Sequence, residues 1–326
     1  MTEAAQPGPV DVPVDLDTIR AAHARIREHV RRTPVLTSPQ LDAAIGSTLF
    51  FKCENLQEIG AFKVRGACNA VLSLDDGQAA RGVVTHSSGN HGAALAWAAA
   101  RRRIPAWIVM PDNAAKVKRS AVTDLGAIVR YCEPTVAARE AMCAAVQTET
   151  GATLVHPYND WRVIAGQGTA ALELLEDVPG LDAIVTPVGG GGLLSGTAIA
   201  AKSMKPSISV FGAEPEGADD AYQSLRSGRI VPQTDPRTIA DGLRSSLGDK
   251  TFAVISSSVD AIATTSEAAI VRAMRLCWEK LRLVVEPSSA VPLAAMLENK
   301  LPIAGMRVGV ILSGGNVDLE RLPWQH

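Results

Sequence analysis

Short, continuous apolar runs alternate with longer amphipathic or alanine-rich stretches along most of the chain. Continuous apolar runs are typical of strands that are buried on both faces of a parallel sheet. They predict strands at residues 48–53, 82–86, 106–110, 128–131, 153–156, 183–188, 209–213, 261–264 and 307–312. The stretches between them predict helices at residues 17–31, 64–73, 91–102, 115–124, 136–150, 165–176, 193–203, 267–280 and 289–298.

This alternation of strands and helices predicts an α/β fold with two doubly wound, mainly parallel sheets. The segment from about Gly82 to Thr150 has the pattern of a compact α/β insert. We therefore expect a discontinuous large domain formed by residues 1–72 and 155–326, and a small α/β domain formed by residues 73–154.

Composition and net charge indicate which kinds of partner and which cell compartment to expect. The chain has 326 residues, of which 47% are hydrophobic and 20% charged, with a net charge of −2. This charge argues against a nucleic-acid or anionic-membrane partner. No apolar run reaches the roughly 20 residues of a membrane span, and the N-terminus lacks the features of a signal peptide. The five scattered cysteines lack metal-site spacing, so we expect reduced thiols in a cytoplasmic protein.

Turns rich in glycine and small polar residues follow three of the predicted strands. PVGGGGLLS ends the strand at 183–188, HSSGNH the strand at 82–86, and LSGGN the strand at 307–312. Ligands of open parallel sheets gather where strands end and helices begin. Glycine turns that lead into helices offer unpaired N–H groups to an anion, and four glycines allow close approach. The four-glycine turn therefore predicts a phosphate site.

The identity of the phosphate ligand stays open at this point. The chain has no GxxxxGK[ST] motif, and the GxGxxG pattern fails at Leu194. Glu214 nevertheless follows at about the distance of a ribose-binding acid, so a nicotinamide-dependent oxidoreductase is one alternative. A purely structural turn is another.

Lys63 in GAFKVRG provides the second sign of chemistry. It stands at the predicted start of a helix, where the helix dipole disfavours a cation. With partial burial, this would lower the pKa of the amine and favour its neutral, nucleophilic form. A solvated surface lysine is the ordinary alternative. A neutral amine and a phosphate site in one protein together indicate a pyridoxal-phosphate enzyme.

Seven motifs occur in a familiar order: GAFKVRGA, HSSGNHGAALA, PVGGGGLLSG, GAEPEGADD, IADGLRSSLG, VEPSSAVPLAA and SGGNVD. Together they resemble the fold-type II pyridoxal-phosphate enzymes of the branch that contains serine racemase, serine/threonine dehydratase and 3-hydroxyaspartate dehydratase. The likeness runs from about Ile19 to Leu319. It implies a tryptophan-synthase-β-like fold with the cofactor in the cleft between two domains, and a homodimer.

The resemblance also implies roles for residues that bind the cofactor. Lys63 would form the covalent imine and act as a base, with Phe62 beside the ring. Asn90 would bond the 3′-hydroxyl and Ser313 the pyridine nitrogen. The phosphate would be held by the main chain of Gly189, Gly190, Gly191, Gly192 and Leu193. Further cofactor residues would be Gly242, Glu286 and Asn316.

Substrate contacts are implied at the small-domain turn. Ser87, Ser88, Asn90 and His91 would receive the substrate carboxylate, although an ordinary helix-capping turn is the alternative. Ser88 matches the acid/base on the opposite face of the cofactor, which racemisation requires. Ser245 would lie near the pocket. Arg139 would bind a second substrate carboxylate if it points inward, whereas a surface helical arginine is the alternative.

A cation site is implied by GAEPEGADD. The carboxylates of Glu214 and Asp220 and the carbonyl of Ala218 would bind a hard divalent cation, with Mg²⁺, Ca²⁺ or Mn²⁺ as candidates. A solvated acidic turn is the alternative.

The expected activity is β-elimination from a small β-hydroxy amino acid, giving an oxo acid and ammonia. L-Serine, L-threonine and 3-hydroxyaspartate all fit this scheme. An amino-acid racemase with side dehydratase activity is the main alternative, and a non-catalytic cofactor-binding protein is a distant one. Two departures from the family pattern limit the transfer of detail: Ala61 replaces the usual serine, and Leu125 stands where animal racemases have a tyrosine at their nucleotide site.

Overall fold

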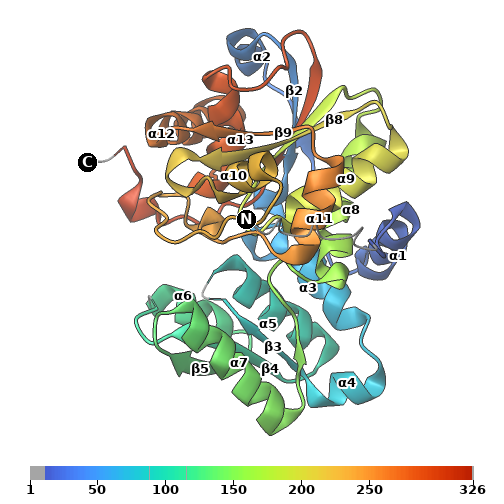
Figure 1. Cartoon of the computed structure of the whole chain (residues 1–326), viewed down its shortest axis with the longest axis vertical. Coiled ribbons are helices and arrows are strands. Elements are labelled where there is room, and N and C mark those ends of the chain that lie inside the picture. Colours follow the sequence, from blue (N-terminus) through green and yellow to red (C-terminus); the bar gives the residue numbers. More distant parts are fainter. Residues whose placement is uncertain (1–11, 88, 115, 325–326) are drawn as a thin grey trace, which may run out of the picture.

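The computed structural model describes residues 12–87, 89–114 and 116–324, and it contains two sheets. Figure 1 shows the small sheet with its helices at the bottom and the large sheet with its helices above. Among the described residues the large sheet has six strands in the order β1-β2-β10-β7-β8-β9, and the small sheet has four in the order β5-β4-β3-β6.

The large sheet is parallel except at one edge, where β1 pairs antiparallel with β2. Strand β10 lies between β2 and β7, although it comes last in the sequence. The strands of this sheet are β1 (Val35–Leu36), β2 (Thr48–Cys53), β7 (Ala183–Pro187), β8 (Ser209–Pro215), β9 (Ala261–Thr265) and β10 (Arg307–Leu312).

The small sheet is parallel throughout the described residues, and all of its strands come from one continuous stretch of chain. They are β3 (Val83–His86), β4 (Ala106–Pro111), β5 (Ile128–Cys132) and β6 (Thr153–Leu154). The strands of the large sheet come from before and after this stretch. The limits of the two expected domains stay a prediction.

Helices cover both faces of each sheet. In Figure 1, α12 and α13 lie on one side of the large sheet, with α8 and α9 on the other. The helices before the small sheet and within it are α1 (Leu16–Ile26), α2 (Pro39–Ile45), α3 (Lys63–Leu72), α4 (Asp76–Arg81), α5 (Asn90–Arg102), α6 (Lys116–Thr123) and α7 (Val136–Thr150). Those that follow are α8 (Trp161–Asp177), α9 (Gly192–Met204), α10 (Asp220–Ser227), α11 (Asp249–Ser258), α12 (Glu267–Leu276) and α13 (Pro287–Leu297).

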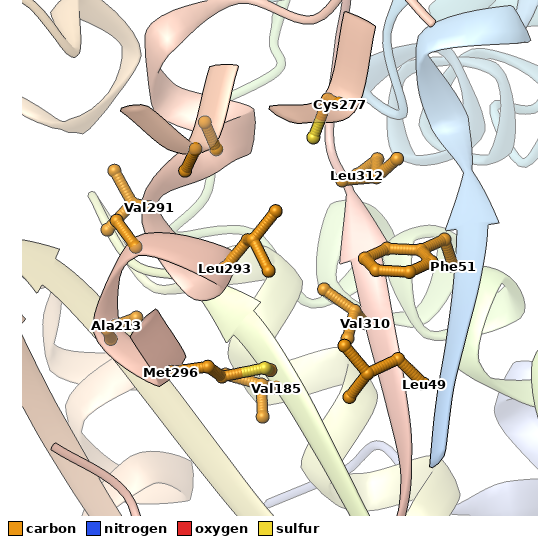
Figure 2. Packing of buried hydrophobic residues seen from close by; sticks show 14 of the residues in the cluster. Leu49, Phe51, Val185, Ala213, Cys277, Val291, Leu293, Met296, Val310 and Leu312 are labelled. Atoms are coloured by element: carbon orange, nitrogen blue, oxygen red, sulfur yellow. The ribbon is translucent and has the colours of Figure 1, made fainter. Parts of the chain in front are cut away.

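The continuous apolar strands have the two-faced burial that their sequence predicts. Val310 packs into the cluster under α12 and α13, whereas the next residue, Ile311, packs into the cluster under α8 and α9. Figure 2 shows Val310 beside Leu49 and Phe51 of the neighbouring strand, facing Leu293 of α13. Successive side chains point to opposite faces of a strand, so a doubly covered sheet needs apolar residues at both positions.

The sequence-based assignment finds nine of the strands with small errors at their ends. It misses the two-residue edge strand β1 and the helices α2, α4, α10 and α11, none of which exceeds ten residues. It also extends two helices too far. Helix α1 ends at Ile26, and α12 ends at Leu276, where a wider helical turn at Cys277–Leu281 follows. Short elements give too few periods for a pattern to be read.

A buried ionic network anchors α3 to the large sheet and to α8. Arg65 has no solvent exposure, and it donates to both oxygens of Glu54 and of Glu173 at 2.7–2.8 Å. Lys52 of β2 also donates to Glu173, at 2.7 Å. Two cations are thus matched by two carboxylates, a condition for tolerating buried charge. Because Arg65 lies two residues after Lys63, the network fixes the start of α3.

Candidate active site

Lys63 is the first residue of α3, and it is half-buried. Its Nζ donates to the carbonyl oxygen of Pro157 at 3.0 Å and lies 5.1 Å from the ring centroid of Phe62. Burial lowers the pKa of Lys63 from 10.5 to about 8, and the opposing charge of Glu286 is too weak to cancel this effect. The amine is therefore partly neutral near physiological pH, as nucleophilic or base chemistry requires.

The segment before Lys63 is tied to the end of β10. Ala61 forms an isolated bridge with Gly314, and the Phe62 N–H donates to the Ser313 carbonyl at 3.0 Å. The N–H of Gly315 donates back to Gly60 at 2.9 Å. This pairing brings two of the motif-bearing turns side by side, with Ser313 buried next to the start of α3.

The four-glycine turn joins β7 to α9, and its main chain has no room for side chains. Gly191 has φ 85°, a left-handed conformation that favours glycine. A Cβ on Gly189 would lie 2.9 Å from the Gly242 carbonyl oxygen, and one on Gly190 would lie 2.2 Å from ring atoms of Tyr158. The turn therefore presents bare main chain at the N-terminus of α9, which begins at Gly192 and Leu193 and suits an anion.

Pro157 and Tyr158 connect the lysine to the glycine turn. The Pro157 carbonyl accepts from Lys63, while the next side chain, Tyr158, packs against Gly190 and Gly192. The amine and the glycine turn thus contact the same two-residue segment. This proximity is what an aldehyde cofactor with a phosphate tail needs.

The N-terminus of α5 enters the same region from the small sheet. Asn90 begins α5, and its Nδ2 donates to both carboxylate oxygens of Glu286 at 3.0 Å. Its Oδ1 accepts from Asn316 Nδ2 at 2.9 Å. Ser87 Oγ accepts from the Gly89 N–H at 3.3 Å. Ser88 lies outside the described residues.

Aromatic rings that sequence reasoning did not select extend from the small sheet to the glycine turn. His86 and His156 make an edge contact with ring centroids 5.3 Å apart, and His156 makes another with Tyr158 at 4.6 Å. Burial, reinforced by His86, lowers the pKa of His156 to about 4. Burial also raises the pKa of Tyr158 to about 12. These rings are neutral at physiological pH. The clue in the sequence was HPYN, which begins at the last residue of the strand predicted at 153–156.

His91, Arg139 and Ser245 differ in how closely they join this region. His91 is buried, and its pKa lies well below the usual value because of burial and the charge of Lys63. Arg139 on α7 donates through Nε to the Thr135 carbonyl at 3.3 Å, and its charge adds to burial in lowering the pKa of His86. Ser245 is half-buried in the segment between Leu243 and α11.

Gly242 lies between the glycine turn and α13. Its carbonyl is the atom closest to a Cβ placed on Gly189, and its N–H donates to Ser288 Oγ of α13 at 3.0 Å.

Glu214 lies near the end of β8, and Asp220 is the first residue of α10. Glu214 is fully buried and accepts from the N–H groups of Ala221 and Tyr222, at 3.2 and 2.8 Å. Asp220 is 3% exposed, and its Oδ2 has no hydrogen-bond partner within the described residues. Burial, with a smaller contribution from Asp220, raises the pKa of Glu214 well above its usual value.

The described residues contain no group of three or more His, Cys, Asp or Glu side chains placed to hold a metal. The donors available between β8 and α10 are therefore the two carboxylates and main-chain oxygens, including that of the buried Ala218. An orphaned, buried carboxylate oxygen fits a hard cation.

Comparison with known proteins identifies the family. The sequence profile described as "Pyridoxal-phosphate dependent enzyme" matches residues 26–314. The chain belongs to this family. Pyridoxal phosphate is thus the cofactor, in preference to the nicotinamide alternative.

No helix among the described residues is both long and apolar enough to span a membrane.

Relatives of this pyridoxal-phosphate enzyme are similar over nearly its whole length. A beta-hydroxyaspartate dehydratase of Paracoccus denitrificans (strain Pd 1222) is 56% identical over 304 residues, which cover 93% of this chain and 96% of the relative. A serine racemase of Arabidopsis thaliana is 54% identical over 313 residues, covering 94% and 95%. The crystal structure of serine racemase from Dictyostelium discoideum has a TM-score of 0.90 and 50% identity, and the match covers 94% of this chain and 99% of that one.

Proposed function

We propose that the chain catalyses β-elimination from a small β-hydroxy amino acid, with 3-hydroxyaspartate preferred over L-serine and L-threonine. Water is lost and then regained in hydrolysis, so each turnover releases one oxo acid and one ammonia. The observation that carries this proposal is the half-buried Lys63, whose amine has its pKa lowered to about 8 and lies next to the segment that packs on the glycine turn.

The residues of the site fit pyridoxal phosphate. Lys63 would hold the cofactor covalently, Phe62 would lie beside its ring, and Ser313 would meet the pyridine nitrogen. Asn90 would donate to the phenolic oxygen. The main chain from Gly189 to Leu193 would bind the phosphate, because it is free of side chains and ends at a helix N-terminus. The bound cofactor supplies a conjugated ring that takes up electrons when a substrate loses its α-proton.

The chain's own groups would then position the substrate and move the proton. Asn90 and His91 begin α5 and Ser87 precedes it, and at this end the helix dipole favours the α-carboxylate. Lys63 would remove the α-proton, since its lowered pKa leaves an appreciable neutral fraction. Ser245 would border the pocket.

Arg139 supports an acidic substrate. Arg139 is half-buried on α7, and its charge contributes to the lowered pKa of His86, whose ring contacts that of His156. A guanidinium there would give the distal carboxylate of 3-hydroxyaspartate a charge-assisted partner. The 56% identical dehydratase supports the same choice.

Racemisation is the second candidate activity. Serine racemases are among the relatives, at 54% identity for the Arabidopsis thaliana protein. Ser88 would deliver a proton to the face of the cofactor opposite Lys63. Both activities start with loss of the α-proton, and they diverge according to whether the β-hydroxyl departs before a proton returns.

A structural cation, a homodimer and a cytoplasmic location complete the proposal. Glu214, Asp220 and the Ala218 carbonyl would bind Mg²⁺, Ca²⁺ or Mn²⁺, and the orphaned Asp220 oxygen supports this. Exposed apolar side chains that include Leu56, Val284 and Trp278 support a second copy as partner. Five unpaired cysteines, most of them buried, support a reducing compartment.

The decisive experiment is a screen of the stereoisomers of 3-hydroxyaspartate, serine and threonine, with ammonia and the chirality of recovered substrate measured together. We expect ammonia release with the highest kcat/KM for a 3-hydroxyaspartate isomer. Arg139→Ala should lower that kcat/KM more than the value for serine, which has no second carboxylate. Inverted substrate without ammonia would establish the racemase instead, and an equal loss for both substrates would remove Arg139 from the proposal.

A further inference from the structure

We propose that Asn316 and Glu286 are positioning residues, which fix the amide of Asn90 so that one of its N–H groups stays available to the cofactor. The inference rests on the proposed contact between Asn90 and the phenolic oxygen of pyridoxal phosphate. It changes the expected role of Asn316 and Glu286 from direct cofactor contacts to the orientation of a third residue.

The direction of the hydrogen-bond chain follows from the groups at its two ends. Asn316 Nδ2 donates to the carbonyl of Ile59 at 2.8 Å and to Asn90 Oδ1 at 2.9 Å. At the other end, Asn90 Nδ2 donates to Glu286. A main-chain carbonyl and a carboxylate can only accept hydrogen bonds. Rotating the Asn316 amide by 180° would turn its oxygen toward the Ile59 carbonyl, and rotating the Asn90 amide would turn its oxygen toward the Glu286 carboxylate.

Counting donors shows what is left. Asn316 has two N–H bonds on Nδ2, and both are used. The two oxygens of the Glu286 carboxylate lie close together, whereas the N–H bonds of an amide diverge widely, so a single N–H of Asn90 serves both oxygens. The second N–H of Asn90 remains for another acceptor, and the developing charge on a phenolic oxygen would make that bond charge-assisted.

Bare main chain makes room for this arrangement. A Cβ on Gly60 would lie 2.5 Å from Asn316 Oδ1, and one on Gly314 would lie 2.7 Å from Glu286 Oε1. Ile59 has φ 55°, which is strained for a β-branched residue, and its carbonyl is the acceptor that sets the direction of the chain. Gly60, Gly314 and the strained turn at Ile59 thus leave room for the hydrogen bonds of Asn316 and Glu286.

The network also joins the two sheets. Asn90 begins α5 on the small sheet, while Glu286 precedes α13 and Asn316 follows β10 on the large one. The same side-chain contacts therefore orient Asn90 and connect α5 to the segments that flank the large sheet.

The test replaces the donor without changing the shape of the side chain. The Asn316→Asp side chain cannot donate a hydrogen bond to the Ile59 carbonyl or to Asn90. It can only accept, so it favours a 180° rotation of the Asn90 amide that turns the amide oxygen toward Glu286. We expect the absorbance band of bound pyridoxal phosphate to move and the cofactor affinity to fall about tenfold or more. Asn316 is exposed, so the acid itself is easily solvated.

Asn55→Asp is the matched control. Asn55 also donates to a main-chain carbonyl, that of Val284 at 3.1 Å, and it packs beside Gly315. The structure gives it no bond to Asn90 within the described residues. This variant should lower thermal stability while leaving the band and the affinity unchanged. An Asn316→Asp protein with the band and affinity of Asn55→Asp would overturn the inference.

A measurement without cofactor separates the inference from the proposed function. In cofactor-free protein, Asn316→Ala and Asn90→Ala should lower the free energy of unfolding non-additively, because both remove the same contact. Additive losses would refute the network. A wild-type protein that binds no pyridoxal phosphate would instead refute the proposed function, and the unfolding cycle would still decide the network.

Discussion

Lys63 Nζ lies 3.0 Å from the carbonyl oxygen of Pro157. A carbonyl accepts from a charged ammonium and from a neutral amine alike, so the contact holds the lysine in place through its titration. Because the following ring, Tyr158, packs on the glycine turn, movement of this one segment would disturb the amine and the phosphate site together.

Cofactor capture should follow the protonation of Lys63. Only the neutral amine attacks the aldehyde, and burial lowers the pKa of Lys63 to about 8. The rate of covalent capture should rise about tenfold per pH unit below that value and level off above it. Stopped-flow absorbance after mixing cofactor-free protein with pyridoxal phosphate measures this rate. Glu286→Gln should move the midpoint to lower pH, and a flat profile would contradict the assignment.

Gly190→Ala should damage the site by steric conflict, since its Cβ would lie 2.2 Å from the ring of Tyr158. We expect a lower unfolding temperature and weaker cofactor binding. The matched test is Gly190→Ala combined with Tyr158→Ala, which opens the space that the new methyl group needs. If the double variant binds cofactor no better than the single one, the steric explanation fails.

A divalent cation should stabilise the protein in a pH-dependent way. Burial raises the pKa of Asp220 from 3.8 to about 7. Within this window the folded protein keeps a proton that the unfolded chain has released, so cation-free stability falls as pH rises. A bound cation removes that penalty, and its effect should be largest above about pH 7.

The cation effect is measured as the change in unfolding temperature between samples with Mg²⁺ and with chelator, below and above the pKa of Asp220. Asp220→Asn should abolish the response, whereas Asp219→Asn should keep it. An equal response to Mg²⁺ in all three proteins would show that Asp220 does not bind the cation.

Glu173→Gln should cost far more stability than the same change at Glu176 on the same helix. Glu173 has a 2% exposed side chain and pairs with the buried Lys52 and Arg65. Its loss should cost about 3 kcal/mol or more, because it leaves buried cations short of a partner. Glu176 is 43% exposed and pairs with Arg32, so its loss should cost less than about 1 kcal/mol. Urea unfolding of both variants gives the comparison, and equal costs would show that the network adds little.

Local chemistry made much of the fold and site predictable. Continuous apolar strands indicated covered parallel sheets, and four glycines after a strand indicated an anion site. The position of Lys63 at a helix start was also foreseen. Each of these features depends on neighbours in sequence, which a pattern can reveal.

Features that depend on distant segments were not predictable in this way. The link from Lys63 to Pro157 spans 94 positions, and the bond from Asn90 to Glu286 spans 196. His156 and Tyr158 belong to none of the seven motifs, and they lie beside His86 because β3 and β6 are neighbours in the small sheet. The expected role of Ser88 stays a prediction, because it lies outside the described residues.

The place of β10 has a consequence for biosynthesis. Arg307–Leu312 fills the gap between β2 and β7, so the ribosome must release almost the entire polypeptide before the larger sheet can close. The strands of the smaller sheet end at Leu154, so they can pair while translation continues. Until then the edges of β2 and β7 that pair with β10 have no partner strand, so loss of the last strand should divide the larger sheet into β1-β2 and β7-β8-β9.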